Sequence, residues 1–345
     1  MLRFLTAGES HGRCMVAILE GMPAGLKLDL KEMNMELKRR QLGYGRGDRM
    51  KIEGDNVEIL SGVRNGLTLG SPIGLYVKNN DFRIDELIAL TNPRPGHADL
   101  VGCLKYGHQD IRNVLERASA RETVCRVAVG SVCKLFLKEF DISVSSDVVM
   151  IGGETDKERM KKKIDAARKH LDTVGGSFTV TAKGLPPGIG SYAAADRRLN
   201  ALLAGAVMSI PAIKAVEVGL GVAYAHALGS KVHDAIYYTK DKGYFRRTNH
   251  AGGIEGGMTN GEPVVLRCTM KPIATIGKPL ESVDIVTKKA VKAAVERYDT
   301  CAVEAAAVVA ESAVAIVLAQ AFLEKFGGDS ITETRRNYKG YTRFL

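Results

Sequence analysis

The chain has 345 residues, 45% of them hydrophobic, so it is long enough to bury one large core or two moderate ones, and disorder is not expected. Lysine and arginine (49) outnumber aspartate and glutamate (39), which gives a formal net charge of +10. That charge suits an acidic small substrate, a nucleic acid or an anionic membrane surface. The basic residues are scattered and no aromatic-rich RNA-binding motif is present, which disfavours nucleic acid.

The cysteines and the apolar segments indicate where the chain resides. The six cysteines are dispersed without a Cys-x-x-Cys pair, and residues 1–4 lead directly into a polar glycine motif rather than a secretory leader. This usage predicts a reducing cytoplasm. The one long apolar stretch, residues 305–319, is interrupted by Glu311 and is shorter than the ~20 residues that span a bilayer. We therefore expect a core helix there and no membrane association.

Hydrophobic periodicity predicts a mixed set of helices and strands. Leu30, Met33 and Leu37 recur at helical spacing after Asp29, which with Glu32 forms a capping box for a helix over 29–40. Later segments predict strands at 52–59, 73–77, 177–182 and 263–270, and helices at 115–140, 156–171, 194–210 and 302–325. Together these elements predict an α+β fold.

Three sequence blocks occur twice in the same order. Residues 21–26 match 184–189, residues 62–73 match 253–264 in their glycine, threonine and proline positions, and Glu-Arg-x-Ser at 116–119 returns as Glu-Arg-x-Asp at 296–299. Three matches in register indicate an internal duplication about a pseudo-two-fold axis, with convergent turn chemistry as the alternative. We expect one domain spanning 1–345, made of related halves at roughly 1–150 and 151–345.

Cationic side chains gather in a few short motifs. Residues 94–99 read Arg-Pro-Gly-His-Ala-Asp, and residues 116–123 read Glu-Arg-Ala-Ser-Ala-Arg-Glu-Thr. Residues 8–12 (Gly-Glu-Ser-His-Gly) add a glycine-flanked histidine, and the end of the first helix and the glycine loop after it add Arg40, Arg46 and Arg49. Guanidinium groups bind phosphate and carboxylate oxygens two at a time. These motifs predict a small polyanionic ligand.

Other functional classes fit the motifs less well. Residues 8–12 match the Gly-x-Ser-x-Gly elbow of serine hydrolases, but such an elbow follows a central strand, and only seven residues precede Gly8. No phosphate-binding loop or dinucleotide fingerprint is present, and the histidines lack the spacing of a metal site. A serine hydrolase using Ser10 and a basic RNA-binding protein remain the alternatives.

A glycine-rich loop at 249–261 has two interpretations. It can be a flexible surface loop, or a backbone that must approach a flat cofactor where any Cβ would collide. Taken together, Gly-Glu-Ser-His-Gly at 8–12, Arg-Pro-Gly-His-Ala-Asp at 94–99, Arg-Ala-Ser-Ala-Arg-Glu-Thr at 117–123, Asn-His-Ala-Gly-Gly-Ile at 249–254, Lys271-Pro272 and Arg297-x-Asp299 closely resemble the chorismate synthase family. The resemblance extends over almost the whole chain.

This resemblance implies the last step of the shikimate pathway, in aromatic amino acid biosynthesis. 5-Enolpyruvylshikimate 3-phosphate loses its phosphate and a C6 hydrogen in a trans-1,4 elimination that yields chorismate, which makes the protein a carbon–oxygen lyase. The family requires reduced FMN although the reaction has no net redox change. A substrate with two carboxylates and a phosphate fits the cationic motifs, and a departing phosphate benefits from a histidine acid.

The resemblance also implies roles for individual residues. His11 would protonate the leaving phosphate, His97 would stabilise or protonate the reduced flavin, and Asp299 would act as a base toward flavin N5, assisted by Ser10 and Ser119. The substrate's anionic groups would be held by Arg40, Arg46, Arg49, Arg94 and Arg121. FMN would contact Arg117, Ala118, Ser119, Pro211, Ala212, Gly256, Lys271, Pro272, Ile273, Ala274, Thr275 and Arg297.

Two departures from the family pattern stand out. Residues 297–301 read Arg-Tyr-Asp-Thr-Cys where the family usually has Arg-His-Asp-Pro-Cys, and Ala118 stands where serine is common. No flavin reductase domain is recognisable, so we expect reduced FMN to come from an external, NAD(P)H-dependent system. The resemblance implies helices sandwiched between antiparallel sheets, assembled as a homotetramer.

Overall fold

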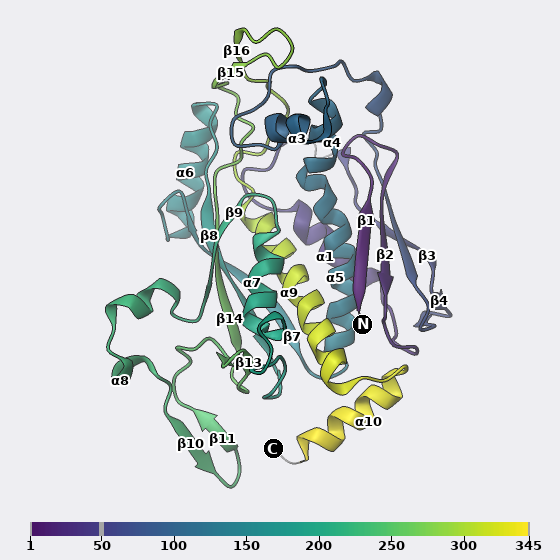
Figure 1. Ribbon diagram of the computed structural model, residues 1–345, viewed down its shortest axis with the longest axis vertical. Coiled ribbons are helices and arrows are strands. Elements are labelled where there is room, and N and C mark those ends of the chain that lie inside the picture. The colour runs from purple at the N-terminus through teal and green to yellow at the C-terminus, as the bar shows by residue number, and fades with distance from the viewer. Residues whose placement is uncertain (1, 48–51, 344–345) are drawn as a thin grey trace.

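The computed structural model describes residues 2–47 and 52–343, and its central feature is a layer of helices between two antiparallel sheets (Figure 1). The helices of this layer are α1 (Leu30–Gln41), α5 (Thr123–Lys138), α7 (Leu199–Met208) and α9 (Val303–Phe326). The expected α+β sandwich is therefore confirmed.

The two sheets have the same strand order. The first runs β1–β2–β6–β3 and consists of Arg3–Ala7, Cys14–Glu20, Ile73–Lys78 and Val57–Ser61. The second runs β7–β8–β14–β9 and consists of Ser143–Ile151, Gly176–Lys183, Val264–Met270 and Ile213–Val218. In chain order, α1 lies between β2 and β3 in the first set, and α7 lies between β8 and β9 in the second. Along the chain, the second set repeats the first.

The repeated sequence blocks form matching turns in the two halves. The hydroxyl of Thr68 donates to the carbonyl of Pro23 (2.6 Å) and accepts from the backbone N–H of Leu26 (2.9 Å). Thr259 makes the same bonds to Pro186 (2.6 Å) and Ile189 (2.9 Å). The second set of elements starts with β7, slightly before residue 150. Shared topology and shared hydrogen bonds both support a duplication.

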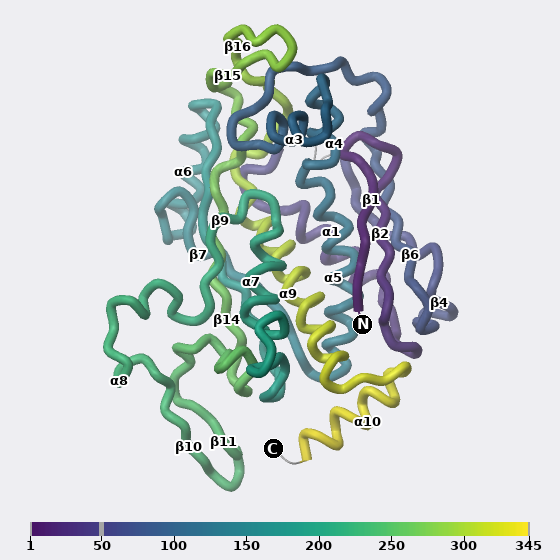
Figure 2. The backbone as a smooth tube through the Cα atoms, viewed as in Figure 1, coloured from purple at the N-terminus to yellow at the C-terminus, as the bar shows by residue number. Residues whose placement is uncertain are grey.

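Shorter elements surround this framework (Figure 2). The remaining α-helices are α3 (Asp99–Tyr106), α4 (Arg112–Ala118), α6 (Lys157–Lys169), α8 (Gly229–Val232) and α10 (Ile331–Thr342). Short strand pairs are β4–β5 (Val63–Arg64 and Leu67–Thr68), β10–β11 (Ile236–Thr239 and Gly243–Arg246), β12–β13 (Ile254–Glu255 and Met258–Thr259) and β15–β16 (Glu281–Val283 and Ala290–Lys292). The 3-10 turns are Ile84–Glu86, Ala120–Glu122, Ala195–Arg197 and Gly221–His226.

One expected helix is broken where the site lies. Periodicity predicted a continuous helix over 115–140, but α4 ends at Ala118, and Ser119 adopts an extended conformation (φ −62°, ψ 143°) before a short turn leads into α5. The Ser119 hydroxyl accepts from the backbone N–H of Arg121 (3.3 Å).

The capping box expected at the start of α1 is only half formed, because Asp29 caps the helix while Glu32 pairs with Lys138.

Helix α9 is buried on nearly all sides. By length and composition it could cross a membrane, but 83% of its apolar window is buried inside the fold, as the core-helix interpretation requires. Its one central charge, Glu311, is fully buried and pairs with Arg39 (2.7 Å) and Lys134 (2.5 Å). Gly130 lets α5 approach α9 closely, because a Cβ there would collide with Ser312. The core thus fixes the relative position of α5 and α9.

Candidate active site

A cavity of about 420 Å³ lies at the N-terminal ends of α5 and α9. Ala120 and Thr123 line it at the start of α5, and Ala302 and Ala305 at the start of α9. Helix N-termini carry partial positive charge, so both helices favour an anion in this position. The volume falls within the ~300–1,000 Å³ of ligand pockets. A second groove, of about 430 Å³, shares Ala118, Ser119 and Pro211 with it.

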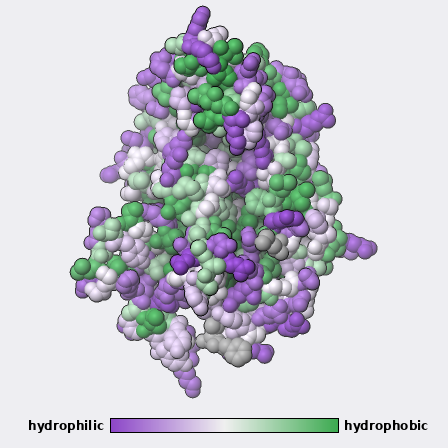
Figure 3. Space-filling model, viewed as in Figure 1, coloured by the Kyte–Doolittle hydropathy of each residue, from purple (hydrophilic) through white to green (hydrophobic). Residues whose placement is uncertain are grey.

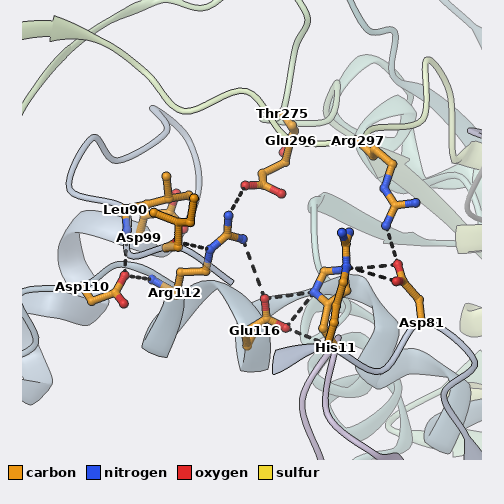
Figure 4. Close-up of polar contacts among 12 residues, drawn as sticks. His11, Asp81, Leu90, Asp99, Asp110, Arg112, Glu116, Thr275, Glu296 and Arg297 are labelled. Carbon is orange, nitrogen blue, oxygen red and sulfur yellow. Dashed lines mark hydrogen bonds and ion pairs between the residues drawn. The ribbon is translucent and has the colours of Figure 1, made fainter. Parts of the chain in front are cut away.

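His11 lies in the loop between β1 and β2, held on both sides by carboxylates (Figure 4). Its Nδ1 is 3.0 Å from both carboxylate oxygens of Glu116, and its backbone N–H donates to Oε2 of the same side chain (2.8 Å). Its Nε2 is 3.6 Å from Oδ2 of Asp81. Burial opposes ionisation of Glu116, but its hydrogen bonds with His11 and the charges of His11 and Arg112 hold its pKa below the ordinary 4.5. Glu116 is therefore a carboxylate at neutral pH.

His97 belongs to a second histidine–carboxylate pair, at the start of α3. Its Nδ1 is 2.5 Å from Oδ1 of the fully buried Asp99, which also accepts two hydrogen bonds from the guanidinium of Arg94 (2.8 and 3.0 Å). Burial alone would raise the pKa of Asp99, but hydrogen bonds from His97 and Arg94 hold it well below its ordinary value. Arg94 also donates to Thr275 (2.6 Å), so it connects the two halves of the chain.

Arg40 and Arg121 share a buried carboxylate. Asp55 pairs with Arg40 (2.6 Å) and with Arg121 (2.5 Å). Burial alone would raise the pKa of Asp55, but the charges of the two arginines outweigh this effect and lower it. Both arginines line the cavity. The Nε of Arg40 is buried and has no hydrogen-bond partner. One carboxylate thus serves two buried guanidinium groups, so positive charge remains to attract a ligand anion.

Asp299 and Arg297 lie on the segment that leads into α9. Asp299 accepts from the backbone N–H of Gly47 (2.6 Å) and pairs with Arg46 (2.9 Å). Arg297 pairs with Asp81, whose pKa is lowered because hydrogen bonding and charge from Arg297 outweigh burial. Asp81 thus links Arg297 to His11, and Asp299 links the glycine loop after α1 to the start of α9.

Most of the expected site residues line this cavity. These are Ser10, His11, Arg40, Arg46, Arg94, His97, Ala118, Ser119, Arg121, Pro211, Ala212, Lys271, Ile273, Ala274, Thr275, Arg297 and Asp299. The motifs that are distant in sequence therefore meet at one place.

Four expected residues are placed differently. Arg117 turns toward β1, where its guanidinium donates to the carbonyls of Thr6 (3.0 Å) and Gly8 (3.0 Å), and it borders the second groove. Gly256 lies in the β12–β13 turn, and neither it nor Pro272 is among the lining residues. Arg49 lies outside the described residues.

Sequence reasoning missed the carboxylates that hold the cations. Asp55, Asp81 and Glu116 were assigned no role, although Glu116 begins one of the duplicated blocks. Its recurrence as Glu296, which pairs with Arg112 at 2.9 Å, was a usable signal. The isolated positions of Asp55 and Asp81 carried no comparable signal. Among the described residues, no group of three or more His, Cys, Asp or Glu side chains could hold a metal ion.

The surroundings of Ser10 differ from those of a hydrolase nucleophile. Strand β1, which precedes it, is at the edge of an antiparallel sheet rather than at its centre. The neighbouring His11 directs Nδ1 to Glu116. A nucleophile elbow is therefore not formed.

Comparisons with known proteins agree with the site. The family model for chorismate synthase matches residues 2–323. Chorismate synthase of Thermoanaerobacter pseudethanolicus is 54% identical over 347 residues, covering 100% of this chain and 99% of its own length. That of Geobacter sulfurreducens is 52% identical over 390 residues, with 100% and 99% covered. A crystal structure of a chorismate synthase superposes with a TM-score of 0.83 at 43% identity, covering 100% of this chain and 98% of that one. The chain belongs to the chorismate synthase family.

Proposed function

We propose that the cavity binds 5-enolpyruvylshikimate 3-phosphate together with reduced FMN, and that its side chains promote the 1,4-elimination of phosphate. Conversion of this substrate to chorismate is the reaction of the family, and it makes the protein a lyase of aromatic amino acid biosynthesis. The observation that carries the proposal is the convergence of two histidine–carboxylate pairs and six cationic side chains, Arg40, Arg46, Arg94, Arg121, Lys271 and Arg297, around one cavity.

The residues present fit a flavin. One wall is formed by small and apolar side chains, namely Ala118, Pro211, Ala212, Ile273 and Ala274, which suit a flat ring system. Lys271 is a cation at this wall, where burial and the charge of Lys214 lower its pKa, so an anionic group nearby would be favourable. The Lys271 ammonium donates to the carbonyl of Gly96 (2.5 Å), which holds it at this wall. When bound, reduced FMN supplies transient electron transfer to the substrate with no net redox change.

The arginines bind the substrate's anionic groups. Arg40 and Arg121, which both pair with Asp55 and line the cavity, provide two guanidinium groups for a phosphate or carboxylate. Arg94 donates to Asp99 and also lines the cavity, so its guanidinium is held close to a bound ligand. Arg46 lines the cavity while paired with Asp299, so a bound anion shares its guanidinium with that carboxylate. Arg49 is assigned the same role from the family resemblance alone.

The histidines and Asp299 move protons. His11 donates the Nε2 proton to the departing phosphate, since Nδ1 is already bonded to Glu116. His97, held through Nδ1 by Asp99, would present Nε2 to the N1 and O2 edge of the flavin. Asp299, which lines the same cavity, would serve as the base on the flavin N5 side. Ser10 and Ser119, which line the same cavity, assist by hydrogen bonding.

The assembly is a homotetramer in this proposal. Apolar side chains are exposed on α3, namely Leu100, Val101 and Leu104, and Figure 3 shows hydrophobic residues gathered at the top of the molecule over this helix. Leu5 and Ile18 form a second exposed apolar pair on β1 and β2. Exposed patches of this kind mark subunit contacts. Light scattering behind size-exclusion chromatography should give four times the mass of the chain.

The reductant comes from elsewhere in the cytoplasm. We assign it to an external NAD(P)H-dependent flavin reductase, and the six cysteines, all unpaired in the fold, fit a reducing compartment. NADPH with oxidised FMN should therefore give no turnover until such a reductase is added.

An anaerobic assay of phosphate release tests the function. We expect release from 5-enolpyruvylshikimate 3-phosphate only when reduced FMN is present. Equal turnover without flavin would contradict the proposal, and ester hydrolysis blocked by a fluorophosphonate at Ser10 would favour a hydrolase. Tight RNA binding that weakens steeply with salt, without elimination activity, would favour a nucleic-acid protein.

A further inference from the structure

Glu116 contacts His11 through the ring and through the backbone at once. Both carboxylate oxygens are 3.0 Å from Nδ1, and Oε2 also accepts the backbone N–H of His11 (2.8 Å). The backbone N–H of Ser10 donates to the carbonyl of Glu116 (2.9 Å), so four contacts tie the β1–β2 loop to α4. The Glu116 side chain is almost fully buried. Its position relative to the imidazole is therefore fixed.

Glu116 is itself held in place from the far side (Figure 4). Arg112, one turn earlier on α4, approaches its Oε1 at 4.0 Å and pairs with Glu296 at 2.9 Å. The backbone N–H of Arg112 donates to Asp110, and its Nε donates to the carbonyl of Ile88. The charge of Arg112 helps to keep the pKa of Glu116 below its ordinary value against the effect of burial.

We infer that Glu116 is a positioning residue that fixes the tautomer of His11. An ionised carboxylate only accepts hydrogen bonds, so Nδ1 must carry a hydrogen, and Nε2 is the nitrogen that exchanges a proton with a ligand in the cavity. Asp81, 3.6 Å from Nε2, adds negative charge on that side. The inference rests on the proposed role of His11 as the acid for the phosphate.

The variant Glu116→Gln separates orientation from charge. The backbone N–H of His11 requires an acceptor at Oε2, so the glutamine oxygen takes that position and its NH2 group faces Nδ1. If Nδ1 kept its hydrogen it could still donate to that oxygen, which is also 3.0 Å away, but the buried NH2 group would then face a donor and have no acceptor at Nδ1. Both groups are satisfied only when Nδ1 is the acceptor, so the hydrogen moves to Nε2. The matched control is Glu122→Gln, because Glu122 bonds Thr6 and Arg126 and no histidine.

Solid-state 15N NMR of histidine-labelled protein reads the tautomer directly. The His11 signals are identified by their loss in His11→Asn. In the wild type and in Glu122→Gln, neutral His11 should carry its hydrogen on Nδ1, and in Glu116→Gln on Nε2. Glu116→Asp, which keeps the carboxylate, should retain the wild-type tautomer in most molecules. A wild-type hydrogen on Nε2, or an unchanged tautomer in Glu116→Gln, would overturn the inference.

Anaerobic steady-state kinetics, which give kcat and KM, measure the functional consequence. Glu116→Gln should lower kcat by about 10²–10⁴-fold, the range for loss of a general acid or its correct tautomer, with KM changed by less than about threefold. Glu116→Asp should recover most of that loss. Equal loss in both variants, or a rise in KM alone, would contradict a positioning role. If His11→Asn retains the wild-type rate, the role proposed for His11 fails, whereas the NMR result still decides what Glu116 does.

Discussion

Each arginine that lines the cavity is paired with a carboxylate, and that pairing determines which of its atoms a ligand can reach. Asp99 holds Arg94 and His97, and Asp55 holds Arg40 and Arg121. Buried carboxylates of this kind orient their partners without neutralising all of their hydrogen-bonding groups. The site is therefore preorganised for anions before any ligand binds.

His97 should behave as a catalytic rather than a structural histidine. His97→Ala should lower turnover by about 10²–10⁴-fold, as expected for a general acid or base, while the melting temperature and FMN affinity stay close to those of the wild type. The same loss is expected for His11→Asn, chosen because asparagine can still donate to Glu116. Near-wild-type single-turnover rates in either variant would refute that residue's role.

Asp99 should make the protein sensitive to acid. Its pKa is lowered in the fold, so its contribution to stability is fully present above its ordinary pKa of 3.8, starts to fall below that pH and is lost only as the pH passes through the lower pKa of the folded state. Asp99→Asn leaves Arg94 without its buried carboxylate and should cost about 3–5 kcal/mol near pH 7. Urea unfolding from pH 7 to about pH 2 checks this. The difference between wild type and variant should begin to shrink below about pH 4 and continue to shrink toward pH 2, and a constant difference over that range would show that the carboxylate charge is not responsible.

How far the sequence predicts the site differs from residue to residue. The histidines and arginines were identified by their motifs, and the structure brings most of them together. Glu116 was not identified, because its role depends on the β1–β2 loop, about 105 positions earlier, lying against α4. Likewise Arg117 is at the expected position, but its side chain bonds the backbone of Thr6 and Gly8, which local sequence does not reveal.

At the scale of elements, most helices and strands with strong periodicity were predicted within a few residues, whereas the strand expected at 52–59 is Val57–Ser61 and the helix expected at 194–210 is Leu199–Met208. Helix α9 was expected at 302–325 and spans Val303–Phe326. The break at Ser119 was not predicted, because hydrophobic spacing continues through it from α4 to α5. The extended backbone at Ser119 is held by tertiary contacts around Glu116 and by the Ser119 hydroxyl. Periodicity measures burial along one axis and does not detect such a change of direction.

The crossing of α5 and α9 yields a prediction about packing. Gly130→Ala places a methyl group against Ser312 and should destabilise the protein by about 1–3 kcal/mol, the range for overpacking. The matched control is Gly205→Ala on α7, where nothing lies within 4 Å of the new Cβ. That change should stabilise the protein by about 0.4–1 kcal/mol through the better helix propensity of alanine. Chemical denaturation of both variants tests this. If the free energy of unfolding changed by a similar amount and in the same direction in both, the prediction would be contradicted.

At the scale of the whole molecule, the site depends on both halves of the chain. The first half supplies His11, Arg40, Arg94 and Arg121, and the second supplies the wall around Lys271 and the segment with Asp299. Arg94 joins them through Thr275, and Asp81 joins them through Arg297. Because the second sheet repeats the strand order of the first, the cavity lies where the equivalent helices α5 and α9 both begin. A duplicated fold thus directs two positive helix ends to one anion site.

The repeated threonines test whether the two halves are energetically equivalent. Thr68→Val and Thr259→Val each remove a hydroxyl that bonds a proline carbonyl and a backbone N–H, and leave both groups buried without that partner. Each should cost about 1–3 kcal/mol of unfolding free energy. Thr181→Val, at a half-buried position on β8, is the control and should change stability by less than about 0.5 kcal/mol. Because the two turns belong to different halves and share no partner, the double variant should equal the sum of the single variants within about 0.5 kcal/mol. Urea unfolding of these four variants and of the wild type gives the free energy of unfolding of each. A large loss at one threonine with none at the other would show that the repeated turn keeps its energetic role in only one half.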